Sequence, residues 1–216
     1  MSSTLPVIND GMGTHSDDVK IISRERVFNG YRKLDKFSFT HTSMNPKAEK
    51  WLPEMTREIM CSSNVAAVLL YEPKKNVLLM NRQFRLAGML AGYESPFMLE
   101  CVAGMVDGGE TPEEAAYRET FEETGSKVKD MEFVGKVLPS AGASTENIYL
   151  YCACIDSIPL EKYHGLPEEG EEIETEVMTI EQVEKLIDED KVHNAMALIL
   201  LNWFLRHHLR LKEKWS

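Results

Sequence analysis

The strongest constraint on the fold is a helix near the middle of the chain whose two ends are both specified by the sequence. Thr111 suits an N-cap, Pro112 suits the first helical position, and Gly125 suits the residue just beyond the last turn. Short apolar runs flank this segment on both sides and are typical of buried strands. A helix set between such strands indicates a mixed fold in which helices pack on a β-sheet.

The strands are predicted from apolar, β-branched runs that end at turn residues. Asn29-Gly30 indicates a hairpin near the N-terminus, joining strands in residues 19–28 and 31–42. Further strands are expected in residues 55–63, 64–73, 75–85, 96–106, 128–139 and 147–155, and two C-terminal helices in residues 180–190 and 192–215. This order predicts an α+β fold, an α-β-α sandwich with a mixed β-sheet between helices, preceded by a small N-terminal β-unit.

Composition narrows the class of protein. The 216 residues carry a net charge of −11, which argues against nucleic acid or an anionic membrane as a partner. No apolar run reaches the length of a membrane span, and the first twenty residues lack the basic start and apolar stretch of a signal peptide. We therefore expect a cytoplasmic protein whose cysteines are buried free thiols: Cys61, Cys101, Cys152 and Cys154.

The predicted central helix carries the acids that suggest chemistry. Glu119, Glu122 and Glu123 stand at i, i+3 and i+4, so their carboxylates share one face and repel each other. Mg²⁺ would relieve this repulsion, because it binds carboxylate oxygens and bridges to phosphates. Arg118 can hold a carboxylate in place through its planar guanidinium. Taken alone, the helix fits a solvated acidic surface better than a metal site.

The spacing of the whole segment changes that balance. Gly104, five residues, Glu110, seven residues, and then Arg118-Glu119-Thr120-x-Glu122-Glu123-x-Gly125 resembles the Nudix box. One position departs from the pattern, since Ser126 stands where an aliphatic residue is usual, and this bears on the packing of the helix end. The resemblance implies a Nudix fold and a metal-dependent pyrophosphatase.

Segments outside the box resemble the bacterial ADP-ribose pyrophosphatases within the Nudix superfamily. They are the N-terminal hairpin, Arg57-Glu58-Ile59, Gln83-Phe84-Arg85, the acidic loop 164–174 and the C-terminal residues 212–215. We therefore expect three parts: a disordered tail at the polar residues 1–18, an N-terminal β-unit (19–60), to which the resemblance assigns dimerisation, and a Nudix catalytic domain (61–216). The resemblance also implies a homodimer that exchanges its N-terminal units and hydrolyses ADP-ribose to AMP and ribose 5-phosphate with Mg²⁺, or with Mn²⁺ as an alternative.

The same resemblance assigns roles to individual residues. The expected metal ligands are the Ala103 carbonyl, Glu119, Glu123 and Glu171. The expected catalytic residues are Glu169 as general base, Glu122 as an assisting acid and Arg118. The expected substrate contacts are Arg85, then Arg57 and Glu58 reaching across from the other subunit, and Glu146, which is also a second candidate base. A closing loop with several carboxylates would also suit a base by general chemistry, although a solvated loop has the same composition.

Three alternatives stay open. The ADP-ribose subfamily usually has a proline sixteen residues after the box glycine, whereas this chain has Ala141, with Pro139 two positions earlier. Another nucleoside diphosphate sugar, such as GDP-mannose, is therefore the second candidate substrate. A Nudix-like regulator that binds ADP-ribose without cleaving it is less favoured, because the box glutamates are all present. A structural or calcium-binding acidic helix is disfavoured, since no EF-hand loop accompanies it.

Overall fold

A computed structural model describes residues 17–166 and 170–216. The chain divides into two compact units. The first extends to Ser62 and includes Ser140–Glu146, and the second comprises Ser63–Pro139 and Asn147–Ser216. Apart from residues 17 and 18, the predicted N-terminal tail lies outside the described residues.

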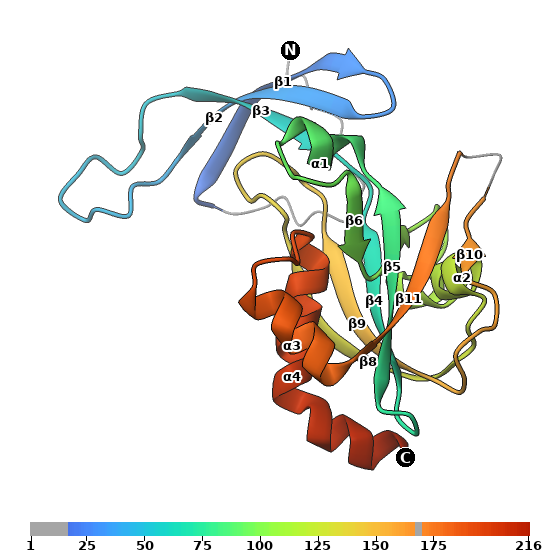
Figure 1. The fold of residues 1–216 in the computed structure, drawn as a ribbon. Coiled ribbons are helices and arrows are strands. Elements are labelled where there is room, and N and C mark those ends of the chain that lie inside the picture. Colours follow the sequence, from blue (N-terminus) through green and yellow to red (C-terminus); the bar gives the residue numbers. More distant parts are fainter. Residues whose placement is uncertain (1–16, 167–169) are drawn as a thin grey trace. The chain divides into compact units, whose positions relative to one another are not determined.

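The first unit is a small antiparallel sheet in the order β1-β2-β3. Its strands are β1 (Val19–Asn29), β2 (Lys33–His41) and β3 (Met55–Cys61), drawn in blue to cyan in Figure 1. The predicted hairpin forms, with Asn29 paired to Lys33 across a turn at residues 30–32. A small N-terminal β-unit is thus confirmed.

A buried carboxylate lies inside this first unit. Asp35 on β2 is fully buried and accepts hydrogen bonds from Arg24 Nε at 2.5 Å and from Arg26. Bonding to Arg26 is the largest of the effects that lower the pKa of Asp35 to about 2. Cys61 Sγ on β3 donates to the same carboxylate at 3.4 Å. Burial and this negative neighbour raise the pKa of Cys61, so Cys61 stays a thiol and helps to hold the three strands together.

The second unit is built on an eight-stranded sheet. Six strands follow the order β10-β11-β5-β4-β9-β8, while β6 pairs with β5 and β7 pairs with β4. The sheet is mixed because β4 and β9 are parallel while the other pairs are antiparallel. The strand bounds are β4 Val65–Glu72, β5 Val77–Phe84, β6 Phe97–Glu100, β7 Val102–Met105, β8 Val128–Val137, β9 Ile148–Ile155, β10 Tyr163–His164 and β11 Ile173–Thr179.

The helices are α1 (Leu86–Leu90), α2 (Pro112–Thr124), α3 (Ile180–Asp188) and α4 (Ala195–Trp215). The ends of α2 are as predicted: Thr111 forms a capping box with Glu114, and Gly125 has the left-handed φ of 66°. The short α1 was not predicted from the sequence. The last helix begins at Ala195, later than predicted, because the side chain of Asn194 caps it by accepting from Ala197 N.

The two faces of the sheet bury separate cores, as β4 shows by its alternation. Ala66, Val68 and Leu70 pack in one cluster with Ala115 and Ala116 of α2. Ala67, Leu69 and Tyr71 alternate with these residues on β4 and pack in a second cluster. That cluster also contains Val183 of α3 and Leu200 and Phe204 of α4. The helices therefore cover opposite faces of the sheet (Figure 1), and the predicted α-β-α arrangement is confirmed.

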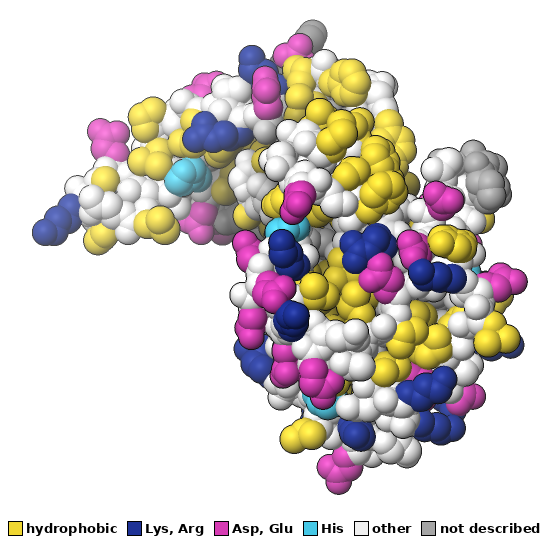
Figure 2. All heavy atoms as spheres, viewed as in Figure 1, with side chains coloured by type: hydrophobic (Ala, Val, Ile, Leu, Met, Phe, Trp, Pro, Cys, Tyr) yellow, Lys and Arg dark blue, Asp and Glu magenta, His cyan; other side chains and the backbone are white. Residues whose placement is uncertain are grey.

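The helices and one face of the surface bear on the class of environment that the protein suits. Within residues 17–166 and 170–216, no helix combines the length and apolar character needed to cross a bilayer. On the face drawn in Figure 2, Lys and Arg side chains are interspersed with Asp and Glu. On this face the acidic side chains are thus mixed with basic ones instead of forming one continuous acidic patch.

Candidate active site

Arg118 on α2 binds three carboxylates at once. Its Nη1 donates to Glu119 Oε1 at 2.7 Å and to Glu122 Oε2 at 3.0 Å. Its Nη2 donates to Glu110 Oε1 at 2.7 Å and to the carbonyl oxygen of Met105 at 3.0 Å. The hydrogen bond to Glu110 is the largest of the effects that raise the pKa of this guanidinium, and the bonds to Glu119 and Glu122 add to it. Arg118 therefore ties the loop before α2 to the acidic face of the helix.

Gly104 on β7 leaves the space that the Glu119 carboxylate fills. A Cβ built on Gly104 would overlap the carboxylate carbon and both carboxylate oxygens of Glu119. Any larger residue would have to displace that side chain. The glycine is required here for close approach of backbone and carboxylate rather than for an unusual φ.

Glu123 is the most deeply buried acid of α2, at 4% exposure. The side-chain amide of Asn81 on β5 donates to its Oε2 at 2.5 Å, and the backbone N–H of Ala103 also bonds its carboxylate. Burial raises the pKa of Glu123 well above its usual value, and the negative charges of Glu119 and Glu171 add to this effect. Burial likewise raises the pKa of Glu119. The acids thus crowd one another with too little positive charge nearby to neutralise them.

Glu171 joins the cluster from the loop before β11. The amide Nε2 of Gln83 on β5 donates to its Oε1 at 2.8 Å. Glu169, the expected general base, lies outside the described residues. The acidic loop therefore contributes at least one carboxylate to the region where α2, β5 and β7 meet.

Arg85, an expected substrate contact, lies beside this cluster. Its Nη2 donates to Glu100 Oε2 at 2.8 Å, and Glu100 Oε1 also accepts from Asn194 Nδ2 at 3.1 Å. Burial lowers the pKa of Arg85, but the hydrogen bond to Glu100 and the charges of Glu100, Glu123 and Glu171 outweigh it, so the pKa is raised. The Arg85 side chain is 41% exposed, so it can still reach a ligand.

Three expected substrate contacts belong to the first unit. Arg57 and Glu58 lie on β3, and Arg57 Nη1 donates to the carbonyl of Thr56 at 2.8 Å. Glu146 forms an ion pair with Arg32 at 3.5 Å within the same unit. The other expected residues that the structure describes lie in the second unit, and the roles of all of them stay predictions.

Three polar residues of the site were not predicted from the sequence: Asn81, Gln83 and Glu100. All three are buried on strands, at 3%, 8% and 5% exposure. In the sequence they appear only as polar residues within apolar strands. That pattern does not show which group each polar side chain bonds. Only the pairing of β5 with β6, which sets Asn81 opposite Glu100, gathers them into one place.

The donor set fits a divalent cation. As the side chains stand, no three His, Cys, Asp or Glu residues of the described chain already enclose a metal position. Arg118 holds the carboxylate of Glu119 in place and Asn81 holds that of Glu123. Burial raises the pKa of both acids, and a divalent cation would offset the cost of burying their charge. Carboxylate and carbonyl oxygens are the ligands that Mg²⁺ and Mn²⁺ prefer.

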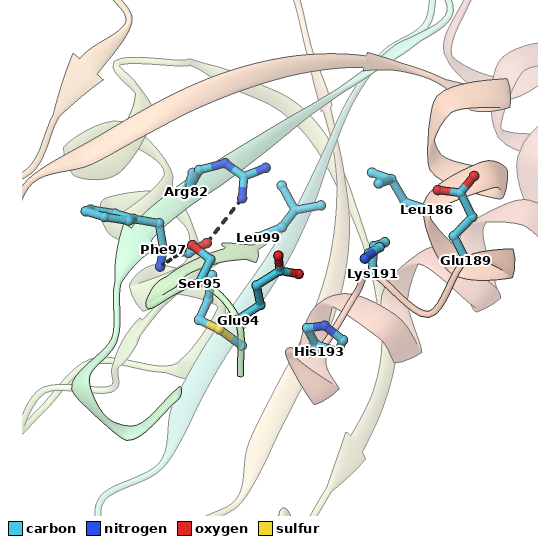
Figure 3. A pocket seen from close by; sticks show the side chains of 10 residues that line it. Arg82, Glu94, Ser95, Phe97, Leu99, Leu186, Glu189, Lys191 and His193 are labelled. Carbon is cyan, nitrogen blue, oxygen red and sulfur yellow. Dashed lines mark hydrogen bonds between the residues drawn. The ribbon is translucent and has the colours of Figure 1, made fainter. Parts of the chain in front are cut away.

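A separate pocket of about 370 Å³ lies between β5, β6 and the connection from α3 to α4. Figure 3 shows Arg82 there, donating to the carbonyl of Phe97, and its guanidinium also bonds Glu176. The pocket is lined by side chains of both charges over an apolar floor: Arg82, Glu94, Ser95, Phe97, Met98, Leu99, Leu186, Glu189, Lys191 and His193. None of the clustered carboxylates lines it, so the acidic cluster is the better candidate for chemistry.

Known proteins resemble this chain over most of its length. ADP-ribose pyrophosphatase of Escherichia coli (strain K12) is 34% identical over 200 residues, covering 93% of this chain and 94% of that protein. The enzyme of the same name from Haemophilus influenzae is 32% identical over 201 residues, covering 92% and 91%. GDP-mannose pyrophosphatase of Escherichia coli O1:K1 is 32% identical over 154 residues, covering 71% and 79%.

A solved structure described as an ADP compounds hydrolase has the same fold. Its TM-score is 0.67 at 19% identity, and the match covers 90% of this chain and 96% of that one. The family model described as NUDIX domain matches residues 62–198, which include the glycine at β7, Arg118 and the acids of α2 and of the loop. With that match over more than half its length, the chain belongs to the Nudix family.

Proposed function

We propose that this Nudix protein hydrolyses the phosphoanhydride of ADP-ribose to AMP and ribose 5-phosphate, with Mg²⁺ as its metal and Mn²⁺ as a substitute. The observation that carries the proposal is the cluster of Glu119, Glu123 and Glu171, in which Arg118 bonds Glu119 while Glu123 and Glu171 are bonded by the neutral amides of Asn81 and Gln83. Similarity to ADP-ribose pyrophosphatases over 93% of the chain supports ADP-ribose as the substrate. The likeness to GDP-mannose pyrophosphatase covers 71% and makes GDP-mannose the alternative.

The proposed metal ligands are Glu119, Glu123, Glu171 and the carbonyl oxygen of Ala103. When bound, the cation offsets the charge of the diphosphate and makes a coordinated water more acidic. Arg118 keeps Glu119 and Glu122 on the metal side of α2. We expect Arg85 to bind a phosphate or ribose oxygen of the substrate through its exposed guanidinium.

Glu169 is the proposed general base. It would accept a proton from the attacking water as the water oxygen bonds to phosphorus and the bridging P–O bond breaks. Support comes from Glu171, two residues later in the sequence, which bonds Gln83 at the cluster. Glu146 is the second candidate for this role.

A panel of nucleotide sugars tests the substrate. With Mg²⁺ present, we expect ADP-ribose to release AMP with kcat/KM at least about tenfold above that for GDP-mannose, a difference of roughly 1.4 kcal/mol in transition-state binding. The released nucleoside monophosphate is identified by chromatography. Faster release of GMP from GDP-mannose would favour the alternative substrate, and binding of ADP-ribose with no cleavage would indicate a regulator.

We also propose a homodimer that exchanges its N-terminal β-units, with Arg57 and Glu58 serving the neighbouring subunit's site. Support comes from β1, whose side chains Val19, Ile21, Ile22, Val27 and Phe28 are 43–58% exposed. A three-stranded unit with so much uncovered apolar surface is stabilised by packing on another surface. Sedimentation should give a mass of about 49 kDa, twice the 24.6 kDa of one chain, whereas a monomer at micromolar concentration would contradict the exchange.

The proposed location is the cytoplasm. All four cysteines are free thiols, and Cys101, Cys152 and Cys154 are buried. Burial raises the pKa of all three, so none is poised to form a disulfide. Unpaired cysteines of this kind suit a reducing compartment.

A further inference from the structure

We propose that Asn81 and Gln83, two amides on one face of β5, are positioning residues that aim the carboxylates of Glu123 and Glu171 at the metal while leaving their charge uncompensated. The proposal rests on the proposed metal-dependent function. It concerns two residues that lie outside the Nudix box and outside the roles assigned above.

The two amides are placed alike. Residues two apart on a strand point to the same face, so Asn81 and Gln83 follow Leu79 on the side of β5 that faces α2. Asn81 Nδ2 donates to Glu123 at 2.5 Å and Gln83 Nε2 donates to Glu171 at 2.8 Å. One rigid central strand thereby fixes a carboxylate of α2 relative to a carboxylate of the acidic loop.

The carboxylates of the site fall into two groups by the charge of their partner. Glu110, Glu119 and Glu122 bond the guanidinium of Arg118, which offsets their negative charge. The amides that bond Glu123 and Glu171 are neutral, so these two acids keep their charge available for a cation. A neutral donor can orient a ligand without competing with the metal, which a lysine or arginine in the same place would do.

The stability of the fold alone does not explain why an asparagine occupies position 81. Its Oδ1 is buried and accepts no hydrogen bond from any described residue, which is costly for an amide oxygen. An apolar residue at this position of a central strand would avoid the cost. The retained amide is therefore explained better by what its Nδ2 holds than by the fold.

The test uses apolar substitutions of similar side-chain length. Asn81→Leu and Gln83→Met remove each donor, and Thr175→Val is the matched control. Thr175 lies opposite Asn81 on β11, is similarly buried at 8% exposure, and bonds the carbonyl of Lys162 instead of a carboxylate. Binding of Mn²⁺ alone is measured by titration, together with kcat/KM and the unfolding temperature.

We expect Asn81→Leu and Gln83→Met each to weaken Mn²⁺ binding by about 10- to 100-fold, the usual effect of losing a partner of a metal ligand. Asn81→Leu removes a buried unpaired Oδ1 but also removes one donor from Glu123, so the metal-free unfolding temperature should stay close to that of wild type. Thr175→Val should bind Mn²⁺ within about twofold of wild type. If Asn81→Leu fails to fold, Asn81→Ser is measured in its place. Mn²⁺ affinity within threefold of wild type in the folded Asn81 variant would overturn the proposal.

A double-mutant cycle separates positioning from a general structural effect. If Asn81 acts through Glu123, adding Asn81→Leu to Glu123→Gln should weaken Mn²⁺ binding no further, whereas independent effects would add. Additive losses would therefore also overturn the proposal. Wild-type protein that binds Mn²⁺ but cleaves no nucleotide sugar would remove the proposed function and leave the positioning test intact.

Discussion

We expect Glu123→Gln to lower kcat/KM for ADP-ribose by about 10³-fold or more, because a metal that stabilises transition-state charge contributes several kcal/mol. Glu123 is 4% exposed, and within the part of the chain that the structure describes its side-chain donor is the neutral amide of Asn81, so a bound cation would be its main source of neutralising charge. Glutamine keeps the volume and a carbonyl oxygen but loses the negative charge. The measurements are steady-state kinetics with Mg²⁺ and titration with Mn²⁺.

The loss should come without unfolding. Burial and the charges of Glu119 and Glu171 raise the pKa of Glu123, so removing its charge relieves an unfavourable burial. We expect the metal-free variant to unfold at or above the wild-type temperature. A Glu123→Gln protein with near wild-type turnover would show that the metal assignment is wrong.

Glu169→Gln serves as the contrasting variant. Removal of a general base should lower kcat by about 10²- to 10⁴-fold while leaving Mn²⁺ affinity close to wild type. Loss of metal binding in this variant would instead make Glu169 a ligand. Full activity would transfer the role of base to Glu146 or another loop acid.

The second large effect is expected from a single methyl group. Gly104→Ala should lower kcat/KM by about 100-fold, because displacing a catalytic group by roughly 1 Å is sufficient for such a loss. The added Cβ would occupy the position of the Glu119 carboxylate, which must then leave both Gly104 and Arg118. Kinetics and Mn²⁺ titration should show weakened metal binding together with the lower rate.

Gly108→Ala is the control for this substitution. Gly108 lies in the loop that follows β7, a Cβ there meets nothing within 4 Å, and its φ is not positive. We expect activity within about twofold of wild type, as for other surface changes. Equal losses in the two variants would show that loop flexibility, rather than the place of Glu119, is what matters.

Much of the fold could be predicted because its signals are local. The ends of α2 follow from Thr111, Pro112 and Gly125, each of which acts within one turn of the helix. The hairpin after β1 follows from Asn29-Gly30 in the same way. The five-residue α1 was missed because its N-cap, Arg85, makes no side-chain capping bond and no acid lies in its first turn.

The sequence alone determined the acidic face of α2 and the family. Residues three and four apart on a helix lie side by side regardless of the rest of the fold. Only the tertiary structure decided what each acid bonds: Arg118 for Glu119, Asn81 for Glu123 and Gln83 for Glu171. Asn81 and Glu123 are 42 residues apart and Gln83 and Glu171 are 88 apart, so these contacts exist only once the sheet has set β5 beside α2 and the acidic loop. The physical reason is that hydrogen bonds and burial depend on distance in space, and no local pattern encodes a partner so far along the chain.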